Sequence, residues 1–110
     1  MTNIMTAKTT TGAGDWRARN ELDSGNGLIS FHAIVSGTGV VSATVDIEVS
    51  NDATNAAGTP SATITLSGAT TDSDIHQTNA SHRYWRANVT AISGTDAAVT
   101  VIANGAISNV

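Results

Sequence analysis

The chain has 110 residues, a formal net charge of −4 at pH 7, 13% charged residues and no cysteine. This length predicts one domain with one core. The absence of cysteine excludes disulfides and thiolate metal ligands. With only five Lys and Arg residues, we expect no nucleic-acid partner. The apolar runs are too short to span a membrane, and the first residues lack the apolar segment of a secretory signal.

The N-terminal residues are rich in Thr and show no regular period. Residues 1–14 are therefore expected to form an extended arm with a short strand at Ile4–Thr9, of the kind that a neighbouring subunit orders. In residues 15–27, Trp16 and Ala18 alternate with arginines, which indicates either a short strand or one helical turn. Asp23–Gly27 is a turn signal.

Two alternating segments follow, and each predicts a half-buried strand. In residues 28–35 one face carries apolar side chains and the other carries Ser30, His32 and Ile34. Ser36–Gly39 is expected to be the loop of a hairpin. Residues 40–50 come next, with polar side chains pointing outward. The expected inward residues of the two segments are Ile29, Phe31, Ala33, Val35, Val41, Ala43, Val45, Ile47 and Val49.

The middle of the chain is more polar. Ser50–Gly58 is expected to be a long loop, and Pro60 excludes a helix and opens a strand over residues 61–67. That strand places Ala62, Ile64 and Leu66 inward. Residues 68–81 have little period and are expected to form a surface loop, with at most a short strand at Asp74–Gln77.

Residues 82–104 form the last predicted unit, a hairpin in which a turn at Ser93–Asp96 joins two strands. Tyr84, Arg86, Asn88 and Thr90 are expected to face outward. The inward residues are expected to be Trp85, Ala87, Val89, Ala91, Ala97, Val99, Val101 and Ala103.

This series of strands and turns, without a sustained helical period, predicts an all-β fold. We expect an antiparallel β-sandwich of jelly-roll or Greek-key type, with six to eight strands over residues 15–110, and a partly closed barrel is the alternative. The low charge suits strands that other protein covers, but it suits equally a monomer with a Ser- and Thr-rich surface.

No pattern in the sequence predicts catalysis, and we expect neither an enzyme nor a cofactor. His32, His76 and His82 have no metal-ligand spacing, and a Ca²⁺ loop around Asp72 and Asp74 would lack ligands. The outward pair Asp46 and Glu48 lies on a flat strand face, where we expect a solvated surface or a partner for Arg83 or Arg86. Glycines fall in turns and form no nucleotide-binding motif.

Tyr84, Arg83 and Arg86 are the candidate contact residues, because aromatic and Arg side chains are enriched in binding hot spots. Simple packing on the sheet surface is the alternative. From the expected arm, Ile4 and Met5 are added as candidate contact residues.

Three segments, Val45–Asp52, Ile64–Gly68 and Tyr84–Thr95, read in this order, resemble small all-β virion proteins of tailed bacteriophages. The resemblance covers roughly residues 28–103 and rests on strand and turn patterns.

The resemblance implies a structural protein of the virion, made in the host bacterial cytoplasm, with no active site. A capsid decoration or cement protein is the leading expectation, with the major capsid protein or another virion protein as partner. It also implies homo-oligomeric assembly, with a trimer favoured. A tail, neck or fibre component and a small carbohydrate-binding module are the alternatives.

Overall fold

The computed structural model describes residues 2–18 and 28–105, and these form an antiparallel all-β fold without helices. One antiparallel sheet contains seven strands. They are β1 (Thr2–Lys8), β2 (Gly12–Ala13), β3 (Arg17–Ala18), β4 (Ile29–Ser50), β5 (Ala62–Gly68), β6 (Thr71–Thr78) and β7 (Tyr84–Gly105). The predicted fold class is therefore confirmed. The predicted turn at Asp23–Gly27 lies outside the described residues.

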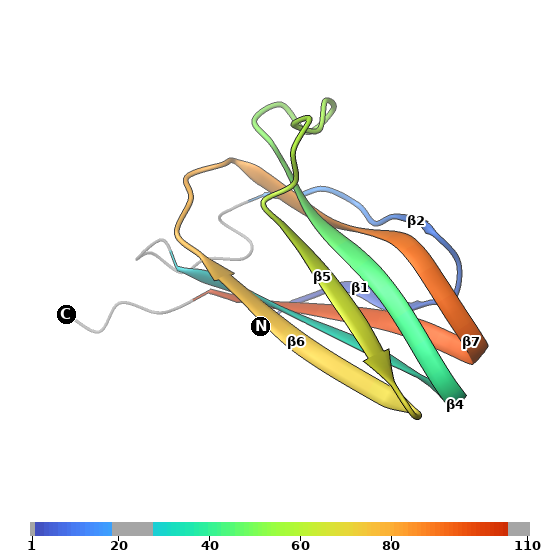
Figure 1. Cartoon of the computed structure of the whole chain (residues 1–110). Coiled ribbons are helices and arrows are strands. Elements are labelled where there is room, and N and C mark those ends of the chain that lie inside the picture. The colour runs from blue at the N-terminus through green and yellow to red at the C-terminus, as the bar shows by residue number, and fades with distance from the viewer. Residues whose placement is uncertain (1, 19–27, 106–110) are drawn as a thin grey trace.

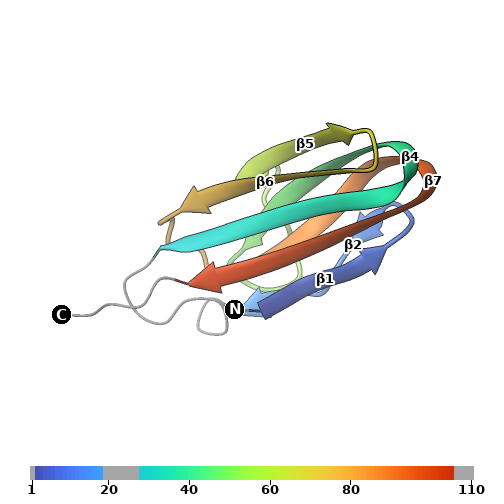
Figure 2. The same cartoon turned by 90° about the horizontal axis from the view of Figure 1, so that it is seen from below.

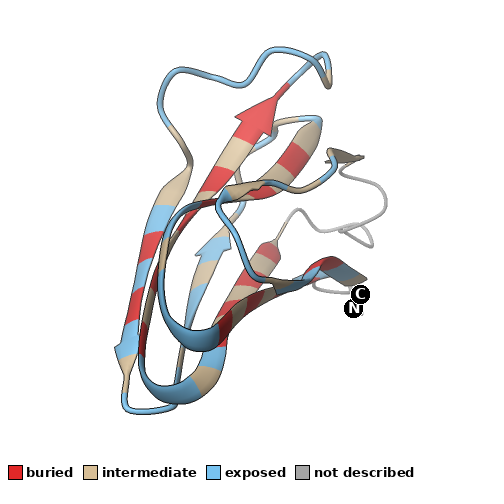
Figure 3. Ribbon diagram, turned by 90° about the vertical axis from the view of Figure 1, so that its right-hand side faces the viewer, coloured by how far each residue is buried: buried red, intermediate tan, exposed pale blue. Residues whose placement is uncertain are grey.

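Two of the strands are 22 residues long, and both bend sharply near their middle. Because β4 and β7 pair along almost their whole length, the sheet folds over at these bends and its two halves face each other (Figures 1 and 3). We call the halves the β6 layer and the β5 layer. The β6 layer holds β1, the second half of β7, the first half of β4, and β6. The β5 layer holds β2 and β3, the first half of β7, the second half of β4, and β5 (Figure 2).

This order of segments in the two layers is that of a jelly roll, in which most connections cross between two facing antiparallel sheets, whereas the connection from β4 to β5 stays within one layer. The arrangement also corrects two expectations. Ser36–Gly39 and Ser93–Asp96 do not close hairpins, because the segments that flank each of them lie in different layers. The ladder of β4 with β7 instead continues through both bends, where Thr38 lies opposite Thr95.

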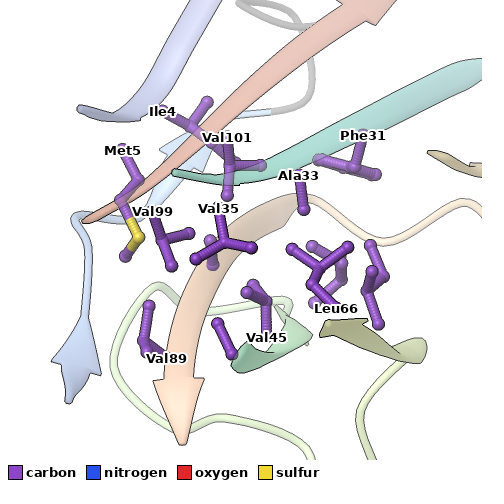
Figure 4. Packing of buried hydrophobic residues seen from close by; sticks show 14 of the residues in the cluster. Ile4, Met5, Phe31, Ala33, Val35, Val45, Leu66, Val89, Val99 and Val101 are labelled. Atoms are coloured by element: carbon purple, nitrogen blue, oxygen red, sulfur yellow. The ribbon is translucent and has the colours of Figure 1, made fainter. Parts of the chain in front are cut away.

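Alternation along the strands supplies the core between the layers (Figures 3 and 4). The rings of Phe31 in the β6 layer and Trp85 in the β5 layer lie 5.3 Å apart between centroids, so they join the two halves directly. The expected inward residues of β4 and β7 are buried, except that Ala91 is exposed. A register shift opposite Thr44 and Val45 interrupts the alternation just before Ala91. In β5, Ile64 and Leu66 are buried, whereas Ala62 is half-buried.

The N-terminal segment differs from the expected arm. Residues 2–8 form strand β1, which pairs with β7 in the same chain and makes one edge of the β6 layer. Ile4 and Met5 point inward (Figure 4) and are only 4% and 6% exposed. The periodic signal was weak here because two register shifts break the alternation of β1. Similarly, β6 is a full strand where mainly a loop was expected, because its polar residues lie at a sheet edge.

Candidate contact surface

Tyr84 and Arg86 lie on the outer face of the β5 layer, as alternation predicted. In the ladder with β4, Tyr84 is opposite Ser50 and Arg86 is opposite Glu48. Trp85 between them points into the core and is fully buried. The sheet therefore divides the aromatic residues of this segment between the core and one outer surface.

Arg86 is the centre of a group of polar and aromatic side chains, which we call the Arg86 cluster (Trp16, Glu48, Arg86 and Asn88). Arg86 Nε donates to Glu48 Oε1 at 2.6 Å, and Asn88 Nδ2 donates to Glu48 Oε2 at 3.0 Å. Both carboxylate oxygens thus accept a hydrogen bond. The guanidinium of Arg86 also lies over the ring of Trp16, 4.3 Å from its centroid, in a cation–π contact.

Trp16 was not among the residues singled out for contact from the sequence. It precedes β3, and β3 pairs with β7 so that Arg17 is opposite Trp85. Because β3 and β7 pair although they are far apart in the sequence, Trp16 lies beside Arg86. The local sequence offered only a short alternation of aromatic and Arg residues, which did not specify the partner strand.

Arg83 and Tyr84 extend the contact surface toward the loop that follows β4. The Arg83 guanidinium lies 5.8 Å from the centroid of the Tyr84 ring. The backbone N–H of Arg83 donates to Asn51 Oδ1 at 3.0 Å. The start of β7 is therefore tied to the loop, and the exposed Arg83 and half-buried Tyr84 lie beside it.

The loop itself is organised around the carboxylate of Asp52. Oδ1 accepts hydrogen bonds from the backbone N–H groups of Asn55 and Thr54 and from the hydroxyl of Ser50, at 2.8, 2.9 and 2.8 Å. Oδ2 accepts from the side-chain amide of Asn55 at 2.8 Å. The Asn55 backbone N–H, followed by these other donors, lowers the pKa of Asp52 well below its usual range. The ionised carboxylate thus fixes the shape of the loop beside Tyr84.

Ile4 and Met5 do not belong to this surface. Both side chains are buried between the layers, so the structure corrects their assignment as contact residues. The prediction of an extended arm was wrong because β1 pairs with β7 of the same chain.

The three histidines weighed as sites lie on different elements of the fold. His32 is on the outer face of the β6 layer, His76 Nε2 is 3.5 Å from Ser61 Oγ, and His82 packs against the edge of Trp85. Within residues 2–18 and 28–105, no group of three His, Asp or Glu residues could hold a metal ion.

The remaining carboxylates have structural partners. Asp46 Oδ1 accepts from the Thr63 hydroxyl at 2.8 Å, and Asp72 Oδ2 accepts from the backbone N–H of Ser67 at 2.9 Å. Asp74 Oδ1 accepts from the backbone N–H of Ile75 at 2.8 Å. The Asp46 bond joins β4 to β5, and the Asp72 bond holds the turn between β5 and β6. Of the two residues expected to face solvent or to pair with Arg83 or Arg86, Glu48 pairs with Arg86, whereas Asp46 bonds Thr63.

A search of the described residues finds no helix that is both long and apolar enough to cross a membrane. No family model, curated protein or solved structure matches the chain.

Proposed function

We propose that this chain is a non-enzymatic virion structural protein of a tailed bacteriophage, which decorates and cements the capsid by binding neighbouring shell subunits. The outer face of the β5 layer around the Arg86 cluster and Tyr84 is the proposed contact surface. The observation that carries the proposal is the ordered grouping of Arg86, Trp16 and Tyr84 on a rigid sheet.

The Arg86 cluster has the properties of a protein-binding hot spot. Arg, Trp and Tyr are the residue types most enriched at such sites. Arg86 and Glu48 are partly exposed, with 25% and 17% of their side-chain surfaces accessible. Because the ion pair and the ring contact already hold the Arg86 side chain, binding costs little further side-chain entropy. A partner can therefore gain contact area without first ordering this surface.

A jelly roll is compatible with this role, since the fold occurs in viral capsid proteins, but it also occurs in lectins. Cementing would act through mass action: a protein that binds only the assembled shell stabilises that shell relative to its dissociated subunits. Several copies held together would add avidity.

The test uses heads that lack this protein, mixed with the purified chain. We expect the wild-type chain to sediment with the heads and to raise the temperature at which they release DNA. Tyr84→Ala and Arg86→Ala should weaken sedimentation, whereas Thr70→Ala, in the exposed turn between β5 and β6 beside the bend, should leave it unchanged. Sedimentation with purified tails but not with heads would assign the chain to a tail, neck or fibre position instead.

A carbohydrate-binding module is the second candidate, and the half-buried Trp16 and Tyr84 with the neighbouring Asn88 favour it. Aromatic rings beside amide and carboxylate groups are suited to sugar rings and hydroxyls. Binding to a glycan array that disappears in Tyr84→Ala, together with no binding to virion particles, would support this function over the first.

A further inference from the structure

Three of the four edges of the two layers carry features that hinder pairing with another chain. At one edge of the β6 layer, β1 is interrupted by two register shifts and by Ala7, whose φ is 49°. At the other edge, β6 carries Asp72 and Asp74. In the β5 layer, β2 and β3 are only two residues long. Bulges, charges and short strands are the features that prevent strand addition. These three edges are therefore poor sites for association, whereas the fourth, β5, is a regular and uncharged strand.

The outer face of the β6 layer is the more apolar of the two outer faces. Ile75 on β6, His32 on β4 and Ile102 on β7 are opposite one another in the ladders, so they form a row across three strands. Ile34 lies on the same side of β4. Ile75 is 58% exposed, one of two large apolar side chains so exposed among the described residues.

A pocket of about 310 Å³ adjoins this row of residues. Besides Ile75, its lining contains one apolar residue, Leu28, which directly precedes β4, and polar side chains. The lining residues are Leu28, Ser30, Ile75, Gln77 and Asn104.

The same face carries no carboxylate among the described residues. Asp46 and Glu48 project from the β5 layer. Asp72 and Asp74 both lie on the side of β6 that faces away from this outer face, and Asp72 accepts a hydrogen bond from Ser67 in β5. The remaining described acids, Asp15, Asp52 and Asp96, are in loops or at the bend. Two copies with a net charge of −4 each repel one another in most orientations. The outer face of the β6 layer is where they can meet with the least repulsion.

We propose that two copies of this chain associate through the outer faces of their β6 layers, around Ile75, His32 and Ile102. Four strands spaced by roughly 4.8 Å, each with about eight residues at ~3.4 Å, give a face of about 500 Å². Two such faces would bury about 1,000 Å², which is near the lower limit for a specific interface. An isologous contact of this kind closes as a two-fold dimer. This inference does not depend on the proposed role in the virion.

The test is analytical ultracentrifugation of the full chain over a wide concentration range. We expect a reversible dimer with a dissociation constant in the micromolar range, as suits a small interface. Ile75→Glu should weaken the dimer at least about 100-fold, because an unpaired carboxylate would be buried at the contact. Val40→Glu is the matched control, since Val40 is 76% exposed at the bend, away from this face. It should leave the dissociation constant unchanged.

Circular dichroism and thermal unfolding of Ile75→Glu establish that the variant is folded. Ile75→Lys places a charge of the opposite sign at the same position and should weaken the dimer as well. The proposal is overturned by a monomeric or trimeric wild type, or by a dimer that Val40→Glu weakens as much as Ile75→Glu. A monomer that binds heads, and loses that binding in Ile75→Glu, would assign this face to a shell subunit and also overturn it. Failure of head binding with an intact dimer would count against the proposed function alone.

Discussion

Arg86 and Glu48 form an ion pair across the central strands of the β5 layer, with Nε and Oε1 2.6 Å apart. The two residues are 38 positions apart in the sequence, and the register of β4 and β7 places them opposite each other. The pair fixes the side chain that we propose as the centre of the contact surface, so its removal should affect both folding and binding.

We expect Arg86→Ala to lower the free energy of unfolding by about 1 kcal/mol, since a partly exposed ion pair contributes modestly. Arg86→Lys should restore less than half of the loss, because Lys lacks the planar guanidinium that pairs with Glu48 and stacks on Trp16. A double-mutant cycle with Glu48→Gln, measured by urea unfolding, isolates the coupling between the two side chains. Additive effects of the two substitutions would contradict the interaction.

Trp85 should be the most sensitive aromatic position of the chain. It is fully buried and contacts the ring of Phe31 in the facing layer. Trp85→Ala should cost about 3–5 kcal/mol of unfolding free energy through lost burial and the cavity left behind. Trp16→Ala is the comparison, because Trp16 is half-buried outside the core, and its cost should be clearly smaller. Equal losses in thermal or urea unfolding would contradict the placement of Trp85.

Gly94 permits the bend of β7 and should not tolerate a side chain. Its φ is +122°, and an added Cβ would lie 2.6 Å from the Val40 carbonyl oxygen. We expect Gly94→Ala to lower the unfolding free energy by about 2 kcal/mol or more, from backbone strain and steric conflict. Gly58→Ala is the matched control, since a Cβ there would have nothing within 4 Å. Chemical denaturation of both variants checks the difference, and a neutral Gly94→Ala would contradict the bend geometry.

Asp52 should make the stability of the chain dependent on pH under acidic conditions. Its pKa in the folded chain is lowered, so its ionised form favours folding. This contribution is fully present above the pKa of the unfolded carboxyl, near 4, and is lost as the pH falls through the lower folded value. Asp52→Asn should therefore reduce the melting temperature at pH 7 by more than at pH 2.5.

Asp15→Asn, which removes an exposed carboxylate outside this loop, corrects the comparison for the change in net charge. If the melting temperatures of Asp52→Asn and the wild type differed equally at both pH values, the proposed role of the Asp52 carboxylate would be contradicted.

Much of the fold follows from alternation alone. Along β4 and the second half of β7, every other side chain is apolar, and those side chains are the ones that the structure buries. The period of two fixes the face on which a residue lies, so Trp85 could be assigned to the core and Arg86 to the surface before the pairing of strands was known. The turn signals likewise marked the bends at Ser36–Gly39 and Ser93–Asp96.

The tertiary structure decided what those bends do and which residues meet. A Gly-containing turn can close a hairpin or carry a strand into a facing layer, and only the long ladder of β4 with β7 selects the second outcome. The same ladder brings Glu48 to Arg86, while β3 brings Trp16 to the other side of the guanidinium. Local periodicity carries no information on such distant partners. It also could not place Ile4 and Met5, which are buried because β1 pairs within its own chain at a bulged sheet edge, where alternation is broken.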